Sequence, residues 1–164
     1  TDTKILASGN LDEERVNALV QSEAPIDRFA VGTAMTTSAD APYLDCAYKL
    51  QEYAGRPCRK RSEGKATWPG RKQVYRRLGR DGRLAEDIIT IEGDNQPGRP
   101  LLQPVMQGGR RLTPSPSIQE IRDHARMALA ELPDTLRRLE QAAPYDVRIA
   151  ETLEQLARQA DRYT

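Results

Sequence analysis

Two short turns near the start of the sequence have residue types that bind phosphate in many α/β proteins. Gly9 lies between Ser8 and Asn10 after the strand-like run 4–7, and Gly32-Thr33 closes the strand-like run that begins at Ile26. A turn that leads from a strand into a helix leaves backbone N–H groups free at the positive end of the helix dipole. Glycine lets the backbone approach a ligand closely. Together the turns predict one phosphate-binding corner, formed by Ser8, Gly9, Asn10, Gly32 and Thr33.

Each turn alone is also compatible with a purely structural role, because capped strand–helix turns are common. Three acidic residues beside the first turn, Asp12, Glu13 and Glu14, moreover oppose an anion there. The ends of two successive strands are nevertheless the place where α/β barrels gather phosphate groups. The occurrence of both turns therefore makes phosphate binding about as plausible as a purely structural role.

The elements around these turns predict a βαβ unit. Asn10 is the expected helix cap, with Glu13 three residues later in the arrangement of a capping box. An apolar stripe at helical spacing follows, formed by Val16, Leu19 and Val20. A strand, a helix and a strand joined by short loops predict two parallel strands.

The rest of the sequence changes character twice. Residues 56–92 predict β-hairpins, with strand-like runs "KATW", "KQVYRRL" and "EDIITI" and turns at Pro69-Gly70 and Asp81-Gly82. Residues from Ser117 onward predict helices, the first one opened by a capping box with Glu120. The fold class is thus α/β, or α+β overall. The expected domains are the last barrel strands with the phosphate-binding loops (1–45), a β-hairpin segment (46–112) and a helical tail (113–164).

Composition excludes several classes of protein. The 164 residues carry a formal net charge of +1, and no apolar run reaches the length that a bilayer requires. The first residues resemble no signal peptide and lack an initiator Met, so we expect a cytoplasmic protein that is part of a longer chain. The spacing of Cys46 and Cys58 fits neither a redox pair nor a zinc site. His124, the single histidine, has no metal-ligating neighbour, so no metal site and no catalytic residue are predicted.

A basic stretch between Arg56 and Arg83 contains eleven Lys or Arg residues against two acidic ones, Glu63 and Asp81. With Trp68 and Tyr75 interleaved, it could bind nucleic acid through phosphate contacts and base stacking. A solvated hairpin face, or one packed against an acidic partner surface, is the favoured interpretation. The segment "SEGKAT" within it lacks the glycine and the Ser/Thr of a nucleotide-binding loop.

Several long patterns resemble the carboxy-terminal part of the nicotinate phosphoribosyltransferase family. They include "PIDRFAVGTAMTTSADAP" and "KRSEGKATWPGRKQVYR", and the resemblance runs from about Ile5 to Leu156. Ala30 departs from the pattern, since the family usually has Gly before "VGT". The resemblance implies the terminal strands of an irregular α/β barrel, then antiparallel β-hairpins and a helical tail.

The resemblance also implies an activity. The family joins nicotinate to 5-phosphoribosyl diphosphate with ATP and Mg²⁺, which yields nicotinate mononucleotide in the salvage of NAD. The resemblance further implies that the predicted corner binds the 5′-phosphate. The family's phosphorylated histidine and nicotinate-holding residues have no counterpart here, so the chain should be inactive alone and should hold neither ATP nor Mg²⁺.

The expected partners are the amino-terminal part of the same enzyme and, when the enzyme is complete, a second copy in a homodimer. Membrane and nucleic acid are not expected. Exposed apolar strand faces near Ile5 and Phe29 would favour this interpretation. The alternative is a non-catalytic module that binds phosphate, or that binds nucleic acid through the basic hairpins.

Overall fold

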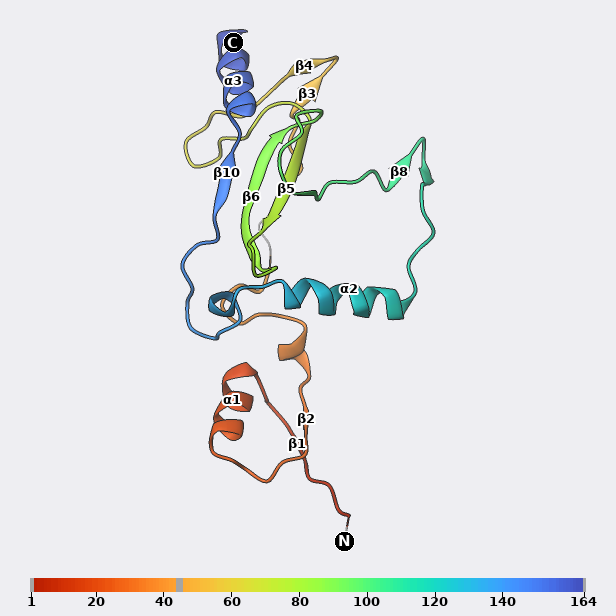
Figure 1. The fold of residues 1–164 in the computed structure, drawn as a ribbon, viewed down its shortest axis with the longest axis vertical. Coiled ribbons are helices and arrows are strands. Elements are labelled where there is room, and N and C mark those ends of the chain that lie inside the picture. Colours follow the sequence, from red (N-terminus) through yellow and green to blue (C-terminus); the bar gives the residue numbers. More distant parts are fainter. Residues whose placement is uncertain (1, 44–45, 164) are drawn as a thin grey trace. The chain divides into compact units, whose positions relative to one another are not determined.

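The computed structural model describes residues 2–43 and 46–163 and divides the chain into two compact units, 1–48 and 49–164. Three α-helices and several small sheets confirm the mixed α/β class (Figure 1). Leu44 and Asp45, beside the expected boundary between the first two domains, lie outside the described residues.

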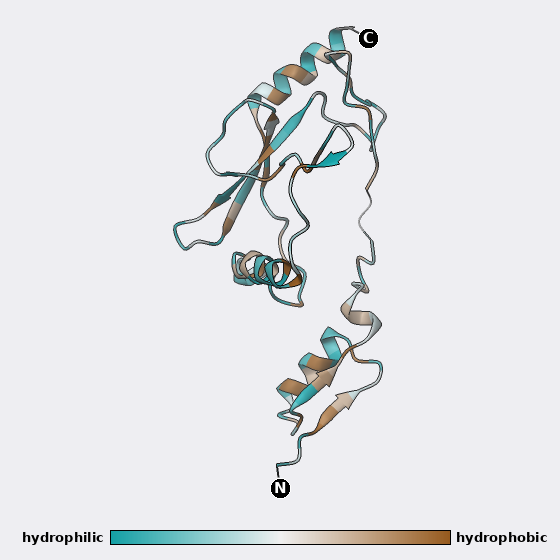
Figure 2. Ribbon diagram, turned by 90° about the vertical axis from the view of Figure 1, so that its right-hand side faces the viewer, coloured by the Kyte–Doolittle hydropathy of each residue, from teal (hydrophilic) through white to brown (hydrophobic). Residues whose placement is uncertain are grey.

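The first unit is a βαβ unit, as the sequence predicts. Strands β1 (Leu6–Ser8) and β2 (Arg28–Ala30) pair in parallel, with Ser8 opposite Ala30. Helix α1 (Glu13–Gln21) connects them, and its hydrophobic and hydrophilic segments are both visible in Figure 2. A single 3₁₀ turn, η1 (Thr33–Met35), follows β2.

The predicted cap of α1 is wrong by two residues. Asp12, not Asn10, is the N-cap: it has an extended backbone, and its carboxylate accepts a hydrogen bond from the Arg15 N–H at 2.8 Å. Asn10 has a φ of 48°, in the left-handed region, so it belongs to the turn before the cap. Glu13 is consequently the first residue of the helix, and no capping box forms.

The second unit is built on a sheet with the strand order β10-β6-β5-β7. The predicted hairpin around Asp81-Gly82 is confirmed, since β5 (Lys72–Leu78) pairs antiparallel with β6 (Leu84–Ile91). The run "KATW" was expected to be a strand but is irregular, so the predicted hairpin around Pro69-Gly70 does not form. The other edge of β5 pairs instead with β7 (Arg99–Pro100). Strand β10 (Val147–Ile149), which lies in the segment predicted to be helical, pairs parallel with β6.

Two further hairpins turn through residues with positive φ. One joins β3 (Glu52–Tyr53) to β4 (Arg56–Pro57), and the other joins β8 (Met106–Gln107) to β9 (Arg110–Arg111). The remaining elements are α2 (Ile118–Ala130), η2 (Asp134–Leu136), α3 (Glu151–Ala160) and η3 (Asp161–Tyr163). The capping box of Ser117 and Glu120 at the start of α2 is confirmed.

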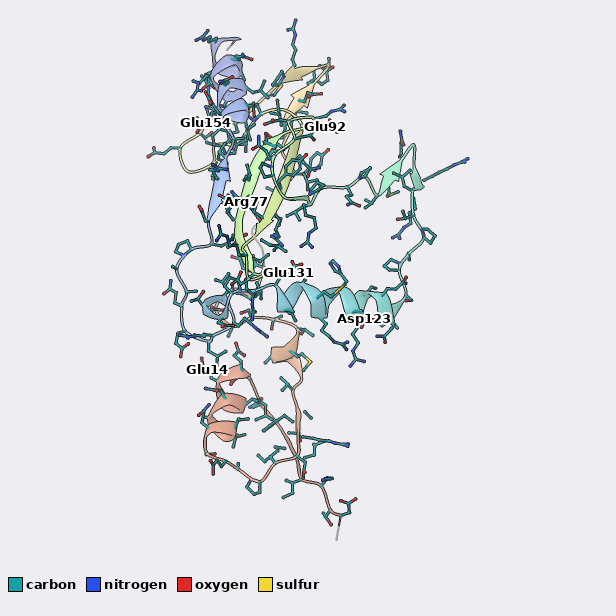
Figure 3. The ribbon with its side chains drawn as sticks, viewed as in Figure 1. Glu14, Arg77, Glu92, Asp123, Glu131 and Glu154 are labelled. Atoms are coloured by element: carbon teal, nitrogen blue, oxygen red, sulfur yellow. The ribbon has the colours of Figure 1, made fainter. Side chains whose placement is uncertain are left out.

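The described apolar residues that are buried all belong to the second unit and include Tyr75, Ile88, Ala150, Leu153 and Ala157. They lie where α3 packs on β6. The carboxyl end of helix α2 contacts the sheet, because the N–H of Leu84 on β6 donates to the Glu131 carbonyl at 2.8 Å. Figure 3 shows Glu131 at this junction and Asp123 farther along α2. Among the described residues of the first unit, none is buried.

Candidate phosphate-binding site

The structure brings four of the five predicted phosphate-binding residues to one cavity. The cavity has a volume of about 760 Å³ and is lined by both turns, including Gly9, Asn10, Gly32 and Thr33. The βαβ topology causes this, because parallel strands end at the same edge of their sheet. Ser8 ends β1 but is not among the lining residues.

Backbone donors are available in both turns. In the described part of the chain, the N–H groups of Gly9 and Asn10 donate no hydrogen bond, and those of Thr33 and Ala34 open the 3₁₀ turn without an acceptor. Apart from the two chain neighbours of each glycine, no described residue has an atom within 4 Å of the position that a Cβ on Gly9 or on Gly32 would take. A small anion could therefore approach these amides closely.

The charge of the cavity is mixed, and one of its side chains was missed by the sequence analysis. Asp12 and Glu13 line the cavity, as expected from their positions beside the first turn, and Arg15 also lines it. The Arg15 Nη1 donates to the Asn10 carbonyl, and its Nε lies 3.7 Å from an Asp12 carboxylate oxygen. The three-residue separation from Asp12 on a helix was the available signal.

The basic stretch is largely neutralised within the second unit. Seven of its eleven cations contact acidic side chains or carbonyl groups of the described residues: Arg59, Arg61, Arg71, Lys72, Arg76, Arg77 and Arg83. Burial lowers the pKa of Lys72, whose Nζ donates to the Trp68 and Gly70 carbonyls at 2.8 and 2.6 Å. This pairing favours a packed hairpin face over a surface for nucleic acid.

A second cavity, of about 560 Å³, is lined by three arginines of the same stretch, Arg56, Arg59 and Arg61. Arg59 makes two hydrogen bonds to the Asp161 carboxylate, at 2.9 and 2.8 Å, and Arg61 lies 3.8 Å from it. Asp161 ends α3, so the negative end of that helix faces the arginines. Arg59 and Arg61 therefore share Asp161 as their counter-charge.

The described residues include no cluster of three or more His, Cys, Asp or Glu side chains that could hold a metal ion. His124 lies on α2, and Cys46 and Cys58 are free thiols. None of the described helices has the length and apolar character needed to cross a bilayer.

Comparisons with known proteins agree with the pattern-based resemblance. Residues 94–157 match the family model of the nicotinate phosphoribosyltransferase C-terminal domain. A nicotinate phosphoribosyltransferase of Mycobacterium tuberculosis (pncB2) is 46% identical over 138 residues, which cover 84% of this chain and 30% of that protein. The human nicotinate phosphoribosyltransferase is 33% identical over 177 residues, which cover 93% of this chain and 33% of that protein.

A solved structure is similar over nearly the whole chain. The crystal structure of human nicotinic acid phosphoribosyltransferase superposes with a TM-score of 0.75 at 27% identity, over 96% of this chain and 33% of that one. The chain thus spans about a third of the length of the relatives that it matches.

Proposed function

Because the chain belongs to the nicotinate phosphoribosyltransferase family, we propose that it serves as the carboxy-terminal part of such an enzyme. The complete enzyme would transfer the phosphoribosyl group of 5-phosphoribosyl diphosphate to nicotinate, with ATP hydrolysis and Mg²⁺, and release nicotinate mononucleotide and diphosphate. In this proposal the chain contributes no catalytic residue. Its contribution is the corner that holds the 5′-phosphate.

The observation that carries the proposal is the cavity shared by the two turns. The amides of Gly9, Asn10 and Thr33 would donate to phosphate oxygens, and the Thr33 hydroxyl would add one more donor. A phosphate held in this way is remote from the reacting ribose carbon. Its binding energy would be used to orient the sugar for reaction.

Exposed apolar surface supports the part of the proposal that concerns the missing elements. Ile5 and Leu6 are 48% and 57% exposed, although Phe29 is half-buried. In the second unit, Ile118 and Leu129 lie on one face of α2 and are 81% and 60% exposed. Apolar stripes of this kind are normally covered. The amino-terminal part of the enzyme is the proposed cover, and a homodimer is the proposed state of the complete enzyme.

The test is an assay for nicotinate mononucleotide from nicotinate, 5-phosphoribosyl diphosphate, ATP and Mg²⁺. The chain is assayed alone and then mixed with the amino-terminal two-thirds of the mycobacterial relative. We expect no product from the chain alone and nicotinate mononucleotide from the mixture. Activity of the chain alone would contradict the proposal, because the chain would then need catalytic residues of its own. A mixture that forms a stable complex but makes no product would also contradict it.

A further inference from the structure

The charge of the first cavity is at odds with its proposed ligand. A phosphate monoester carries close to two negative charges at neutral pH. The cavity already contains the carboxylates of Asp12 and Glu13, which would repel it. Backbone amides supply hydrogen bonds but no net positive charge. A cation is required, and Arg15 is the single Lys or Arg among the residues that line the cavity.

We propose that Arg15 contacts the 5′-phosphate directly and supplies this charge. The inference rests on the proposed function, because it assigns a residue to the same site. The Arg15 side chain is 58% exposed, and its Nη2 has no hydrogen-bond partner among the described residues. A guanidinium that keeps Nη1 on the Asn10 carbonyl can present Nη2 to a phosphate oxygen.

The position of Arg15 on its helix points the same way. It is the third residue of α1, in the first turn, where the helix dipole disfavours a positive charge. The pair with Asp12 is exposed and contributes little. Helix stability therefore does not account for an arginine here. A residue that breaks a local preference in this way is expected at a binding site.

The experiment titrates the whole chain with ribose 5-phosphate and follows the amide NMR signals of Gly9, Asn10, Gly32 and Thr33. Arg15→Gln should weaken binding about tenfold or more, the usual effect of losing a charge-assisted hydrogen bond. Arg28→Gln is the matched control, because Arg28 lies on β2 in the same unit, does not line the cavity, and loses the same charge. Arg15→Lys should restore part of the affinity.

Two readouts separate a direct contact from a structural role. Arg15→Gln should reduce the dependence of affinity on salt, and it should raise the second pKa of the bound phosphate, measured by ³¹P NMR, because the neighbouring cation is gone. Binding that is equal in Arg15→Gln and wild type would overturn the assignment of Arg15 and leave the phosphate corner intact. A wild-type chain whose amides do not respond to ribose 5-phosphate would count against the proposed corner itself.

Discussion

Removal of the Asp87 carboxylate should be among the most damaging single changes to the second unit. Asp87 on β6 is 8% exposed, and its carboxylate accepts from Arg76 Nε at 2.9 Å, Arg76 Nη2 at 2.8 Å and the Tyr145 hydroxyl at 3.2 Å. Burial and the charge of Asp87 raise the pKa of Tyr145 to about 12, so the phenol remains a donor. The carboxylate thereby joins β5, β6 and the segment that precedes β10.

The magnitude follows from the burial of the two partners. Breaking a fully buried ion pair costs about 3–5 kcal/mol, and breaking an exposed one costs less than about 1 kcal/mol. The Arg76 side chain is 29% exposed. We therefore expect Asp87→Asn to lower the free energy of unfolding by about 2–3 kcal/mol and Tm by roughly 10 °C.

The pH dependence gives a second signature. The hydrogen bond from Arg76 lowers the pKa of Asp87 below its ordinary value of 3.8. A carboxylate with a lowered pKa in the folded state stabilises the protein fully above the ordinary pKa, and the stabilisation is lost as the pH falls through the folded-state pKa. The difference between wild type and Asp87→Asn should therefore be largest at neutral pH and shrink below about pH 4.

Urea unfolding followed by the fluorescence of Trp68, the single tryptophan of the protein, reports on the second unit. Glu92→Gln is the control, because Glu92 is 66% exposed and lies 3.7 Å from Arg71, so less than about 0.5 kcal/mol should be lost. Equal stability of Asp87→Asn and Glu92→Gln at pH 7 would refute the reasoning. A difference from wild type that persists unchanged at pH 3 would refute the role of the charge.

Two further substitutions test how α3 is held against the sheet. Gly70→Ala would place a Cβ 2.8 Å from Leu156 Cδ2 at a residue with a φ of 73°. Gly82 has a similar φ but open space around it, so Gly70→Ala should lower the free energy of unfolding by about 1 kcal/mol more than Gly82→Ala does. Thermal unfolding of the two variants tests this difference. Asp94 accepts hydrogen bonds from the hydroxyls of Thr90 and, at 2.6 Å, Thr152, so Asp94→Ala should cost about 1–2 kcal/mol and speed hydrogen exchange in α3. Unchanged exchange in α3 would show that Asp94 does not hold the helix.

Local patterns were sufficient to predict the βαβ unit and the central hairpin, because both are encoded within short stretches. The cap of α1 was misassigned since Asn10 and Asp12 are equally good cap residues in sequence, and only the left-handed backbone of Asn10 distinguishes them. Strand β10 has three residues, and its partner β6 ends about 56 residues earlier in the sequence. A strand this short, paired with a distant segment, leaves no local pattern from which the pairing could be predicted.

The basic stretch shows the same limit in its electrostatics. A run of cations is visible in the sequence, but the acidic partners are not, since Asp161 lies 102 residues after Arg59. The turns of the candidate site, in contrast, are visible in the sequence. They were found because their residues are adjacent in sequence, whereas Arg15 was missed because its side chain reaches back over a helical turn to Asn10.

The first unit combines a cavity with a weak core, and this has a consequence for assembly. Two short parallel strands and one helix, with no buried residue among those described, provide little stability by themselves. In the proposed function, both the 5′-phosphate and the amino-terminal part of the enzyme would stabilise this unit. Two ligands that favour the same ordered state increase each other's affinity by the same factor. Ribose 5-phosphate should therefore tighten the association of this chain with the amino-terminal part, and Arg15→Gln should weaken that effect without weakening association in the absence of phosphate.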